Sequence, residues 1–286
     1  MECYKARLVI LENDQIEGID CTETFAPVAK MVTVRVFLAV AVARHWQVHQ
    51  MDVYNDFLHG DLQEEVYMKL PLGFHILTPN KVCKLKNFLY GLKQAPRSWF
   101  AKLSVALKVY GFRQSCSDYS LCSMTSGQIH LSVLVHVDDL IVVGNDTNGI
   151  WQFKAYLSDC FHMKDLGVLK YFLGVKLARS QEGGFLYQRK YALDIINEVG
   201  LLGAKPVCVL IEQNHRLALS TSEFLIDLEK YHCLVGRLIY LCFIRPELSY
   251  SVHILSQFMQ QPREDHWQAA LCVVCYLKQN PDKVSC

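Results

Sequence analysis

The sequence predicts an α+β protein with a large hydrophobic core, and three observations point to that class. Of its 286 residues, 51% are hydrophobic, which is enough for one large domain or two of ordinary size. Up to about residue 190, strand-like and helix-like patterns follow one another along the chain. Beyond that point the pattern becomes mainly helical. We therefore expect a domain boundary between residues 188 and 189, which separates 1–188 from 189–286.

Hydrophobic periodicity predicts the individual elements, since a period near 3.6 indicates a helix and a period of two indicates a strand. Strands are expected over 48–54 and 65–69, as a hairpin over 128–144, and as short strands within 169–186 around a Gly183–Gly184 turn. The polar stretch 212–223 is expected to be a loop. Pro96 fits the first turn of a helix, where its missing N–H costs little. Helices are expected over 33–46, 95–110, 151–161, 191–199, 231–243, 248–260 and 265–279.

Charge and cysteine usage restrict the class of protein. The net charge of +1 excludes a uniformly basic nucleic-acid-binding protein but leaves room for a local basic surface. The 12 cysteines form no convincing disulfide or zinc framework, and the pair Cys272 and Cys275 has no second pair nearby. The charged start MECYKARLV does not fit a signal peptide, and no apolar run reaches the roughly 20 residues that span a bilayer. We expect an intracellular protein without a membrane partner.

The segment 81–113 is basic and contains no acidic residue. Cationic side chains can neutralise phosphates and aromatic faces can stack on bases, so the segment is a candidate nucleic-acid surface. An amphipathic helix with solvated lysines would give the same pattern. The basic residues are Lys81, Lys84, Lys86, Lys93, Arg97, Lys102, Lys108 and Arg113, and the aromatic ones are Phe88, Tyr90, Trp99, Phe100, Tyr110 and Phe112.

The stretch LSVLVHVDDLIVVG places Asp138 and Asp139 side by side in an apolar run. Burying two adjacent carboxylates is costly, and Asp-Asp is a poor two-residue hairpin turn. A pair of Mg²⁺ ions would compensate both charges and could clamp the oxygens of an in-line phosphoryl displacement. Asp52 closes the strand-like run WQVHQMDV within an acidic stretch, and it could supply a third ligand. Alone, Asp52 is better explained as a capping or loop residue.

At these residues the sequence resembles the reverse transcriptase of copia-type LTR retrotransposons. The segments that carry the resemblance are QMDVYNDFLHGDLQEEVYMKLPLGF, LYGLKQAPRSW, VHVDDLIVVGND, MKDLGVLKYFLGV, QRKYALDII and LVGRLIYL. They follow the family's order and spacing, and the similarity runs over nearly the whole chain.

The resemblance implies an RNA-directed DNA polymerase with a right-hand fold, made of fingers, a palm with an antiparallel sheet, and a helical thumb. Fingers and palm would occupy 1–188, and thumb and connection 189–286, which would stop before any RNase H domain. Asp52, Asp138 and Asp139 would be catalytic and hold two Mg²⁺ or Mn²⁺ ions, and Phe57 would exclude the ribose 2′-OH. Further nucleotide-binding residues would be Lys5, Arg7, Gln94 and Lys164. The nucleic acid would be bound by Lys84, Lys86, Lys93, Arg97, Tyr171 and Gly174.

The implied partners are an RNA or DNA template with its primer, a dNTP, and the integrase and RNase H of the same polyprotein. The implied location is the element's cytoplasmic particle or the nucleus. The chain departs from the family at His136, where an aromatic Tyr or Phe is usual, at Asp56, where a small residue is usual, and in the acidic segment ILEND. These departures leave a second hypothesis open, a catalytically decayed or repurposed nucleic-acid-binding remnant. A third hypothesis is a structural protein whose acidic pair is only a turn, with Asp52 far from it.

Overall fold

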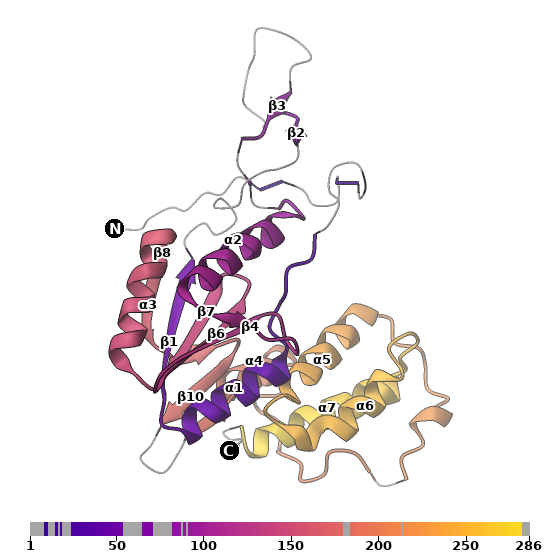
Figure 1. Ribbon diagram of the computed structural model, residues 1–286. Coiled ribbons are helices and arrows are strands. Elements are labelled where there is room, and N and C mark those ends of the chain that lie inside the picture. Colours follow the sequence, from indigo (N-terminus) through magenta and orange to yellow (C-terminus); the bar gives the residue numbers. More distant parts are fainter. Residues whose placement is uncertain are drawn as a thin grey trace, which may run out of the picture. The chain divides into compact units, whose positions relative to one another are not determined.

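The computed structural model describes residues 9–10, 15–16, 18, 24–53, 65–70, 82–86, 88–89, 91–179, 184–212 and 214–281. The chain divides into two compact units, Met1–Leu169 and Lys170–Cys286 (Figure 1). Helices occur together with antiparallel sheets, which confirms the predicted α+β class.

The first unit contains β1 (Gln47–Val53), β2 (Tyr67–Met68), β3 (Cys83–Lys84), β4 (Arg113–Gln114), β5 (Leu121–Ser126), β6 (Ile129–His136), β7 (Asp139–Gly144) and β8 (Met163–Val168), with the helices α1 (Met31–Ala43), α2 (Ala95–Tyr110) and α3 (Thr147–Cys160). The second contains β9 (Tyr171–Phe172), β10 (Val175–Arg179) and β11 (Gly184–Tyr187), the helices α4 (Arg189–Glu198), α5 (Leu228–Leu241), α6 (Ser249–Ser256) and α7 (Glu264–Gln279), and the 3₁₀ turns η3 (Leu217–Leu219) and η4 (Pro246–Leu248).

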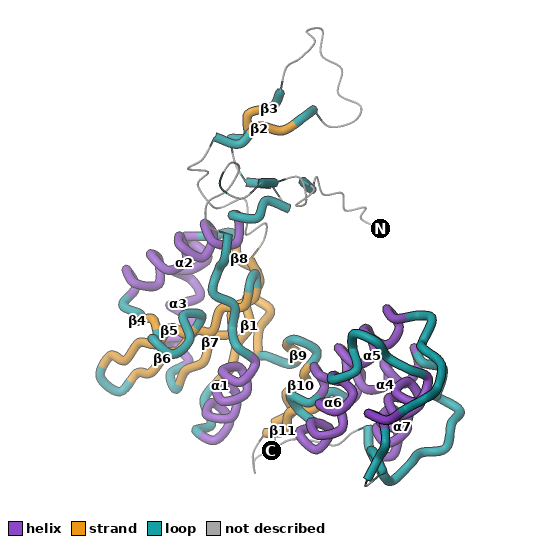
Figure 2. Tube along the Cα trace, turned by 90° about the vertical axis from the view of Figure 1, so that its right-hand side faces the viewer, coloured by secondary structure: helices purple, strands orange, loops and turns teal. Residues whose placement is uncertain are grey.

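A six-stranded antiparallel sheet organises the first unit, with the strand order β4-β5-β6-β7-β1-β8 (Figure 2). The hairpin β6–β7 lies beside β1, although β1 comes much earlier in the sequence. β1 therefore fills a position between β7 and β8, and both of its edges are hydrogen-bonded.

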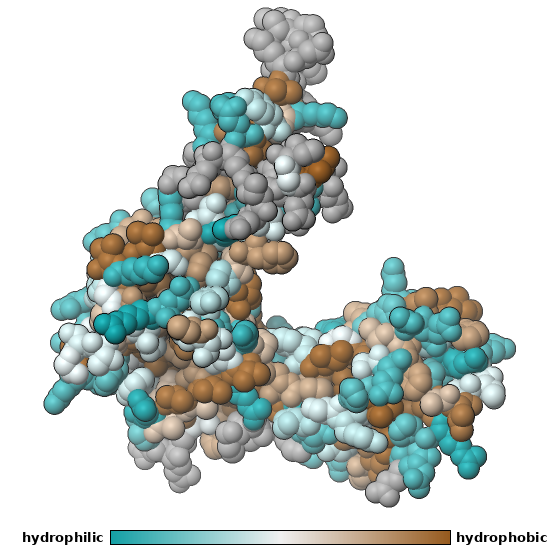
Figure 3. All heavy atoms as spheres, turned by 45° about the vertical axis from the view of Figure 1, so that its right-hand side comes forward, coloured by the Kyte–Doolittle hydropathy of each residue, from teal (hydrophilic) through white to brown (hydrophobic). Residues whose placement is uncertain are grey.

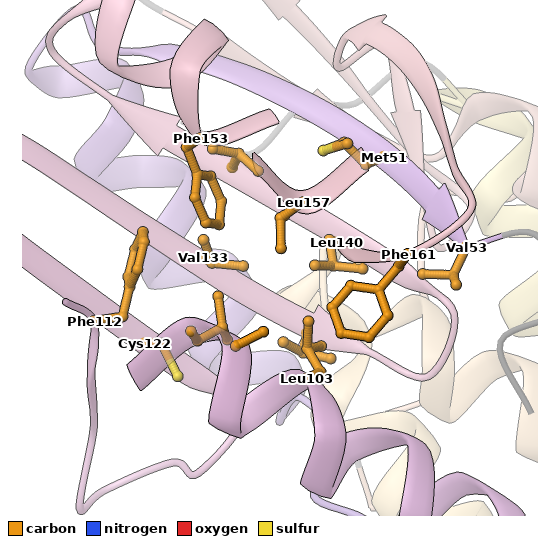
Figure 4. Packing of buried hydrophobic residues seen from close by; sticks show 14 of the residues in the cluster. Met51, Val53, Leu103, Phe112, Cys122, Val133, Leu140, Phe153, Leu157 and Phe161 are labelled. Atoms are coloured by element: carbon orange, nitrogen blue, oxygen red, sulfur yellow. The ribbon is translucent and has the colours of Figure 1, made fainter. Parts of the chain in front are cut away.

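One face of this sheet packs against α2 and α3 in a single hydrophobic core. Strand alternation sends Met51, Val133 and Leu140 to this face, where they meet Leu103 of α2 and Phe153 of α3 (Figure 4). α2 is a helix because its apolar residues recur at helical spacing. It ends at Gly111, whose φ of 114° is in the left-handed region that glycine adopts readily. The core fixes which strand residues point away from it, and these include the acidic ones.

The second unit combines the three-stranded sheet β11-β10-β9 with a helical core. The core is built from the apolar faces of α4, α5, α6 and α7. Tyr231 is fully buried at its centre and donates a hydrogen bond from its hydroxyl group to the carbonyl oxygen of Leu255, at 2.8 Å. Burying an aromatic ring while its polar atom keeps a partner stabilises this core without an unsatisfied group.

Most predicted elements are present, but three strands of the large sheet, β4, β5 and β8, were not expected. β4 has only two residues, and β5 and β8 mix polar with apolar residues and are exposed over half or more of their length, so their sequences do not reveal half-buried strands. The compact units meet at residues 169 and 170, earlier than the expected boundary at 188/189, because β9–β11 belong to the same unit as the helices. The expected Gly183–Gly184 turn lies partly outside the described residues.

In the described part of the chain, no helix combines the length and the apolar character needed to cross a bilayer. Hydrophilic and hydrophobic residues both contribute to the surface shown in Figure 3.

Candidate active site

Strand register brings three predicted site residues into one row across the large sheet. On β1, Asp52 is paired directly with Asp139 of β7 and, on its other side, with Lys164 of β8. Directly paired residues of antiparallel strands project from the same face, with Cβ atoms about 4.5–5.5 Å apart. Asp52, Asp139 and Lys164 therefore lie together on the face opposite the core formed with α2 and α3. This juxtaposition contradicts the structural hypothesis that required Asp52 to be far from the acidic pair.

The two residues at the turn of the β6–β7 hairpin are Val137 and Asp138, because His136 is paired with Asp139. The turn thus lies one residue before the aspartate pair, and Asp139 is the first residue of β7. Val137 has a φ of 55°, a left-handed conformation that is strained for a β-branched side chain. Its carbonyl oxygen accepts a hydrogen bond from Nε1 of Trp99 at 3.3 Å, and the carbonyl oxygen of Asp138 accepts one from the backbone N–H of Val53 at 3.1 Å. The turn is held against both α2 and β1.

The electrostatics of the row favour a bound cation. Partial burial raises the pKa of the Asp139 carboxyl group, and the nearby charge of Asp52 raises it further. A hydrogen bond from Nε2 of Gln50 to Asp139, at 2.9 Å, acts in the opposite direction. Burial lowers the pKa of His136 more than Asp139 and Asp138 raise it, so this side chain adds little positive charge at neutral pH.

A polar network on the opposite face ties β8 to β1 directly behind this row. The Lys154 ammonium group of α3 is buried; it forms an ion pair with Asp165 of β8 at 2.6 Å and a hydrogen bond to Nδ1 of His49 at 3.1 Å. The other ring nitrogen of His49 donates to Gln47, 3.1 Å away. Because Asp165 is adjacent to Lys164, this network fixes the strand pairing that places Lys164 beside Asp52. The pairing of β1 with β8 also has a register shift nearby, between Gln50 and Met51.

Asp52 and Asp139, the two carboxylates of this row, are called the acidic row below. Their oxygens are hard ligands of the kind that Mg²⁺ prefers. Asp52 and Asp139 are side by side. The pKa of Asp139 is raised mainly by burial and further by the charge of Asp52, and a bound divalent cation would offset both effects. Among the residues that the structure describes, no group of three or more His, Cys, Asp or Glu side chains converges in an arrangement that could hold a metal ion. The donor set fits a hard metal ion in its chemistry.

The basic segment 81–113 divides into exposed cations and buried aromatic rings. Lys86 and Arg97 are exposed, whereas Lys84 forms an ion pair with Glu65 across the β2–β3 region. Such an exposed pair contributes little to stability. Base stacking by the aromatic residues of this segment is contradicted where the structure describes them, because Phe88, Trp99, Phe100 and Phe112 are buried and Tyr110 packs against the core. The helical part of the segment is thus the amphipathic helix that was the alternative.

The segment just before α2 packs against residues from near the N-terminus. Gln94, predicted to contact the nucleotide, is buried, and its Oε1 accepts a hydrogen bond from Nε2 of Gln15 at 3.2 Å. Lys93 donates from its backbone N–H to Oε1 of Gln15 at 2.8 Å. Gly91 has a φ of 91°, and a Cβ atom there would lie 2.0 Å from the carbonyl oxygen of Ile10. Only glycine fits this close approach.

Tyr171 and Gly174, predicted to bind the nucleic acid, lie on β9 and in the tight turn between β9 and β10, respectively. The central residues Leu173 and Gly174 have φ angles of 47° and 69°, as in a type I′ turn. Leucine is strained in this conformation, and the hydroxyl group of Tyr240 on α5 holds the turn by donating to the carbonyl oxygen of Leu173. Tyr171 is 45% exposed, so its ring is accessible to a ligand.

Other predicted residues lie outside the described part of the chain, namely Lys5, Arg7 and Phe57, together with Asp56 and the acidic residues of ILEND. Sequence reasoning also missed two supporting residues. Gln50 could have been found, since it lies two positions before Asp52 and must share its face of the strand. Trp99 gave no such signal, because a tryptophan at helical spacing is expected in the core, and its N–H reaches the turn only through the tertiary fold.

Comparison with known proteins identifies the class to which this fold and acidic row belong. Residues 2–213 match the family model described as reverse transcriptase (RNA-dependent DNA polymerase). The chain therefore belongs to the reverse transcriptase family. No solved structure matches the chain.

The relatives are Pol polyproteins of copia-type retrotransposons, as the motif resemblance predicted. The chain is 44% identical over 280 residues to the retrovirus-related Pol polyprotein from transposon RE2 of Arabidopsis thaliana. The match covers 98% of this chain and 19% of that polyprotein. It is 36% identical over 287 residues to the retrovirus-related Pol polyprotein from transposon TNT 1-94 of Nicotiana tabacum, covering 96% and 22%. The chain thus spans about one fifth of the length of these curated relatives.

Proposed function

We propose that this chain is the template-directed DNA polymerase part of a retrotransposon polyprotein, with a right-hand arrangement of fingers, palm and thumb. The observation that carries the proposal is the pairing of Asp52 with Asp139 across β1 and β7, beside the turn residue Asp138. Two carboxylates on adjacent strands and a third in the neighbouring turn, in a chain of the reverse transcriptase family, are a ligand set for two-metal nucleotidyl transfer.

In this mechanism Asp52, Asp138 and Asp139 hold two Mg²⁺ or Mn²⁺ ions. Ions held there would supply Lewis-acid chemistry, which would favour ionisation of the primer 3′-OH and offset the negative charge on the α-phosphate and the leaving pyrophosphate. Gln50 orients the carboxylate of Asp139 through their hydrogen bond. Lys164 is exposed on the strand next to Asp52, where its ammonium group can approach the leaving phosphates. The partners are a primed RNA or DNA template and a dNTP.

Primer extension on an RNA template with Mg²⁺ or Mn²⁺ tests the proposal. Wild-type chain should extend the primer, and the double variant Asp138→Asn with Asp139→Asn should lose extension while it still binds the primer–template. The variant Asp159→Asn removes an exposed carboxylate of α3, which packs on the opposite face of the sheet, and is a matched control that should extend normally. Extension that persists in the double variant would rule out the assigned carboxylates.

A second candidate function is binding without catalysis, by a decayed or repurposed copy of the same fold. The observation in its favour is the pairing of His136 with Asp139, which places an imidazole beside the acidic row where the family usually has an aromatic ring. This candidate predicts salt-dependent binding of primer–template without extension. Activity that returns in His136→Tyr, Asp56→Ala or the double variant would identify the lesions.

A further inference from the structure

A short strand of backbone lies in the second unit, just before α5. Phe224 forms an isolated antiparallel bridge with Arg263, the residue that precedes α7. Two backbone hydrogen bonds flank this bridge: the N–H of Leu225 donates at 2.9 Å, and the carbonyl oxygen of Glu223 accepts at 3.0 Å. Residues 223–225 are therefore one strand of a minimal sheet, in which the segment before α7 pairs with one of its two edges.

The other edge of this strand is unpaired. Along a strand the N–H and C=O groups of successive residues point to alternate edges, so both groups of Phe224 point away from the bridge. Among the residues that the structure describes, neither group forms a hydrogen bond, and neither does the N–H of Ile226. Such a row of unpaired backbone groups is a template for one more strand.

The side chains of the same strand are apolar on both faces. Leu225 packs against the helical core of the second unit. Phe224 is 56% exposed and Ile226 is 100% exposed. An exposed strand face is normally polar, whereas a continuous apolar run is typical of a strand that is covered on both faces. The free edge and the exposed apolar pair therefore both indicate that a further chain covers this strand.

A groove of about 730 Å³ runs along the strand, and we call it the edge groove. Its lining consists of the stretch 222–227, Lys230 of α5, and Glu264 and Trp267 of α7. A groove of this volume has room for several side chains of a bound peptide. Trp267 is 8% exposed and forms part of its apolar wall.

The charge of the edge groove is negative. Three carboxylates line it, those of Glu223, Asp227 and Glu264, and they face one ammonium group, that of Lys230. None of the three carboxylates is in an ion pair with another described residue. Asp227 caps α5 and Glu264 lies in the first turn of α7, where both stabilise a helix start, but Glu223 has no such role. The groove therefore attracts basic side chains and repels the phosphates of nucleic acid.

A second copy of this chain fits the free edge poorly. Antiparallel pairing of two such edges, centred on Leu225, would align Phe224 with Ile226 and Glu223 with Asp227. Like charges directly opposite each other on neighbouring strands are destabilising. A strand with lysine or arginine at those positions would bring opposite charges together instead.

We propose that the edge groove binds an extended basic segment of a partner protein, which adds as a strand beside Phe224. Backbone hydrogen bonds to the free edge give affinity, and alternate side chains give specificity, as in other cases of strand addition. In a segment that alternates apolar and basic residues, the apolar ones contact Phe224 and Ile226, and the basic ones face Glu223 and Asp227. The site uses neither the acidic row nor the primer–template, so it is independent of the proposed polymerase function.

Labelled peptides of alternating lysine and valine, about six residues long as in a common strand, probe this site on the full chain by fluorescence anisotropy. A glutamate–valine peptide of equal length tests the sign of the charge. Two further lysine–valine peptides carry backbone N-methyl groups. Methylation of the valines blocks the N–H groups that would pair with the free edge. Methylation of the lysines blocks N–H groups that would face solvent, and this peptide is the matched control.

We expect the lysine–valine peptide to bind more tightly than the glutamate–valine peptide, and its affinity should fall as salt is added. N-methylation of the valines should weaken binding by roughly tenfold, as for the loss of two neutral hydrogen bonds. N-methylation of the lysines should change the affinity little.

Two variants of the chain locate the site. Phe224→Pro removes the outward N–H but no bond of the bridge, and an edge strand tolerates proline where the N–H faces solvent. Phe224→Ala is its matched control, because it also removes the ring but keeps the N–H. Glu223→Gln with Asp227→Asn removes two charges, while asparagine still caps α5. Glu212→Gln, at an exposed position in the same unit, is the control for charge. Thermal unfolding verifies that each variant is folded.

Phe224→Pro should bind the lysine–valine peptide about fivefold more weakly than Phe224→Ala, as for one hydrogen bond. The double charge variant should bind it more weakly than wild type and with less dependence on salt, and Glu212→Gln should match wild type.

Equal affinities for the lysine–valine and glutamate–valine peptides, or for the two methylated peptides, would overturn the proposal. Undiminished binding by the double charge variant would do the same. So would self-association of the chain in sedimentation that persists in Phe224→Ala and disappears in Phe224→Pro, because a second copy would then occupy the free edge.

Discussion

The buried ion pair between Lys154 and Asp165 allows a sharp test of the fold behind the acidic row. The side chain of Lys154 is 4% exposed and that of Asp165 is 36% exposed. Asp165→Asn would leave the ammonium group buried without its carboxylate. Lys154→Met would leave a carboxylate that still reaches water and accepts a hydrogen bond from the backbone N–H of Gly167 at 2.8 Å. The two substitutions should therefore be unequal, although they break the same pair.

The expected magnitudes follow from this asymmetry. Removing one partner of a buried pair costs about 3–5 kcal/mol when the remaining charge stays buried, so we expect Asp165→Asn to lower the free energy of unfolding by about 3 kcal/mol. Lys154→Met should lower it by only about 1–2 kcal/mol, mainly because Nδ1 of His49 loses its donor. For a unit of this size, 3 kcal/mol lowers the melting temperature by roughly 6–12 °C.

Urea unfolding followed by tryptophan fluorescence measures both values. Trp46, Trp99 and Trp151 lie in the first unit and Trp267 in the second, so the fluorescence signal reports mainly on the unit that contains the pair. Equal losses in the two variants, or losses below about 0.5 kcal/mol in both, would refute the reasoning, since an exposed pair would behave in that way.

The pair also has a pH dependence of known sign. Burial raises the pKa of the Asp165 carboxyl group, but the hydrogen bonds from Lys154 and from the N–H of Gly167, with the nearby charges, lower it by more. Its contribution to stability is therefore complete above the unfolded pKa of about 3.9 and is lost as the pH falls through the lower folded value. Asp165→Asn should lack this acid-dependent loss.

Three further predictions concern the acidic row and the segment before α2. Val137→Gly should raise stability by about 1 kcal/mol in thermal unfolding, because it relieves a positive φ, and an unchanged or lower value would contradict the assigned strain. Asp139→Asn should abolish extension yet stabilise the metal-free chain by about 1 kcal/mol at pH 7. That gain should vanish below about pH 4, because a raised folded pKa of Asp139 costs stability only where the unfolded carboxyl group is ionised. A gain that persists in acid would argue against a raised pKa of Asp139. Gly91→Ala should cost more than about 2 kcal/mol and expose the preceding segment to limited proteolysis, because its Cβ would overlap the carbonyl oxygen of Ile10, whereas Gly203→Ala, with open space, should be nearly neutral.

The sequence predicts those parts of the site that depend on the local hydrophobic pattern and on the spacing of residues. The apolar alternation around VHVDD located the β6–β7 hairpin, and the run ending in Asp52 located β1. That these strands are neighbours was not visible in either pattern, since β1 pairs with residues much later in the chain. The need for a third metal ligand suggested that Asp52 lies near the pair, and the reverse transcriptase resemblance implied it. The register of the sheet places Asp52 beside Asp139.

The unpredicted parts depend on tertiary context. β8 faces solvent at Lys164 and Asp165, so it has no apolar alternation to reveal it, and its pairing with β1 is fixed instead by the buried Lys154. The position of the turn could not be predicted, because turn preferences argue against a valine with positive φ. The cost is met by tertiary contacts of the turn, among them the bond from Trp99, which no local rule includes.

The position of β1 between β7 and β8 also governs when the site can form during synthesis. β1 is complete at Val53, but its two neighbours begin only at Asp139 and Met163. At ordinary ribosomal rates, on the order of ten seconds pass before both have been made. During that interval β1 has two unpaired edges, which are the feature that templates association with other strands. The acidic row is therefore among the last parts of the first unit to assemble, and its long-range pairing makes the folding of this unit slow relative to that of the locally connected helices that follow.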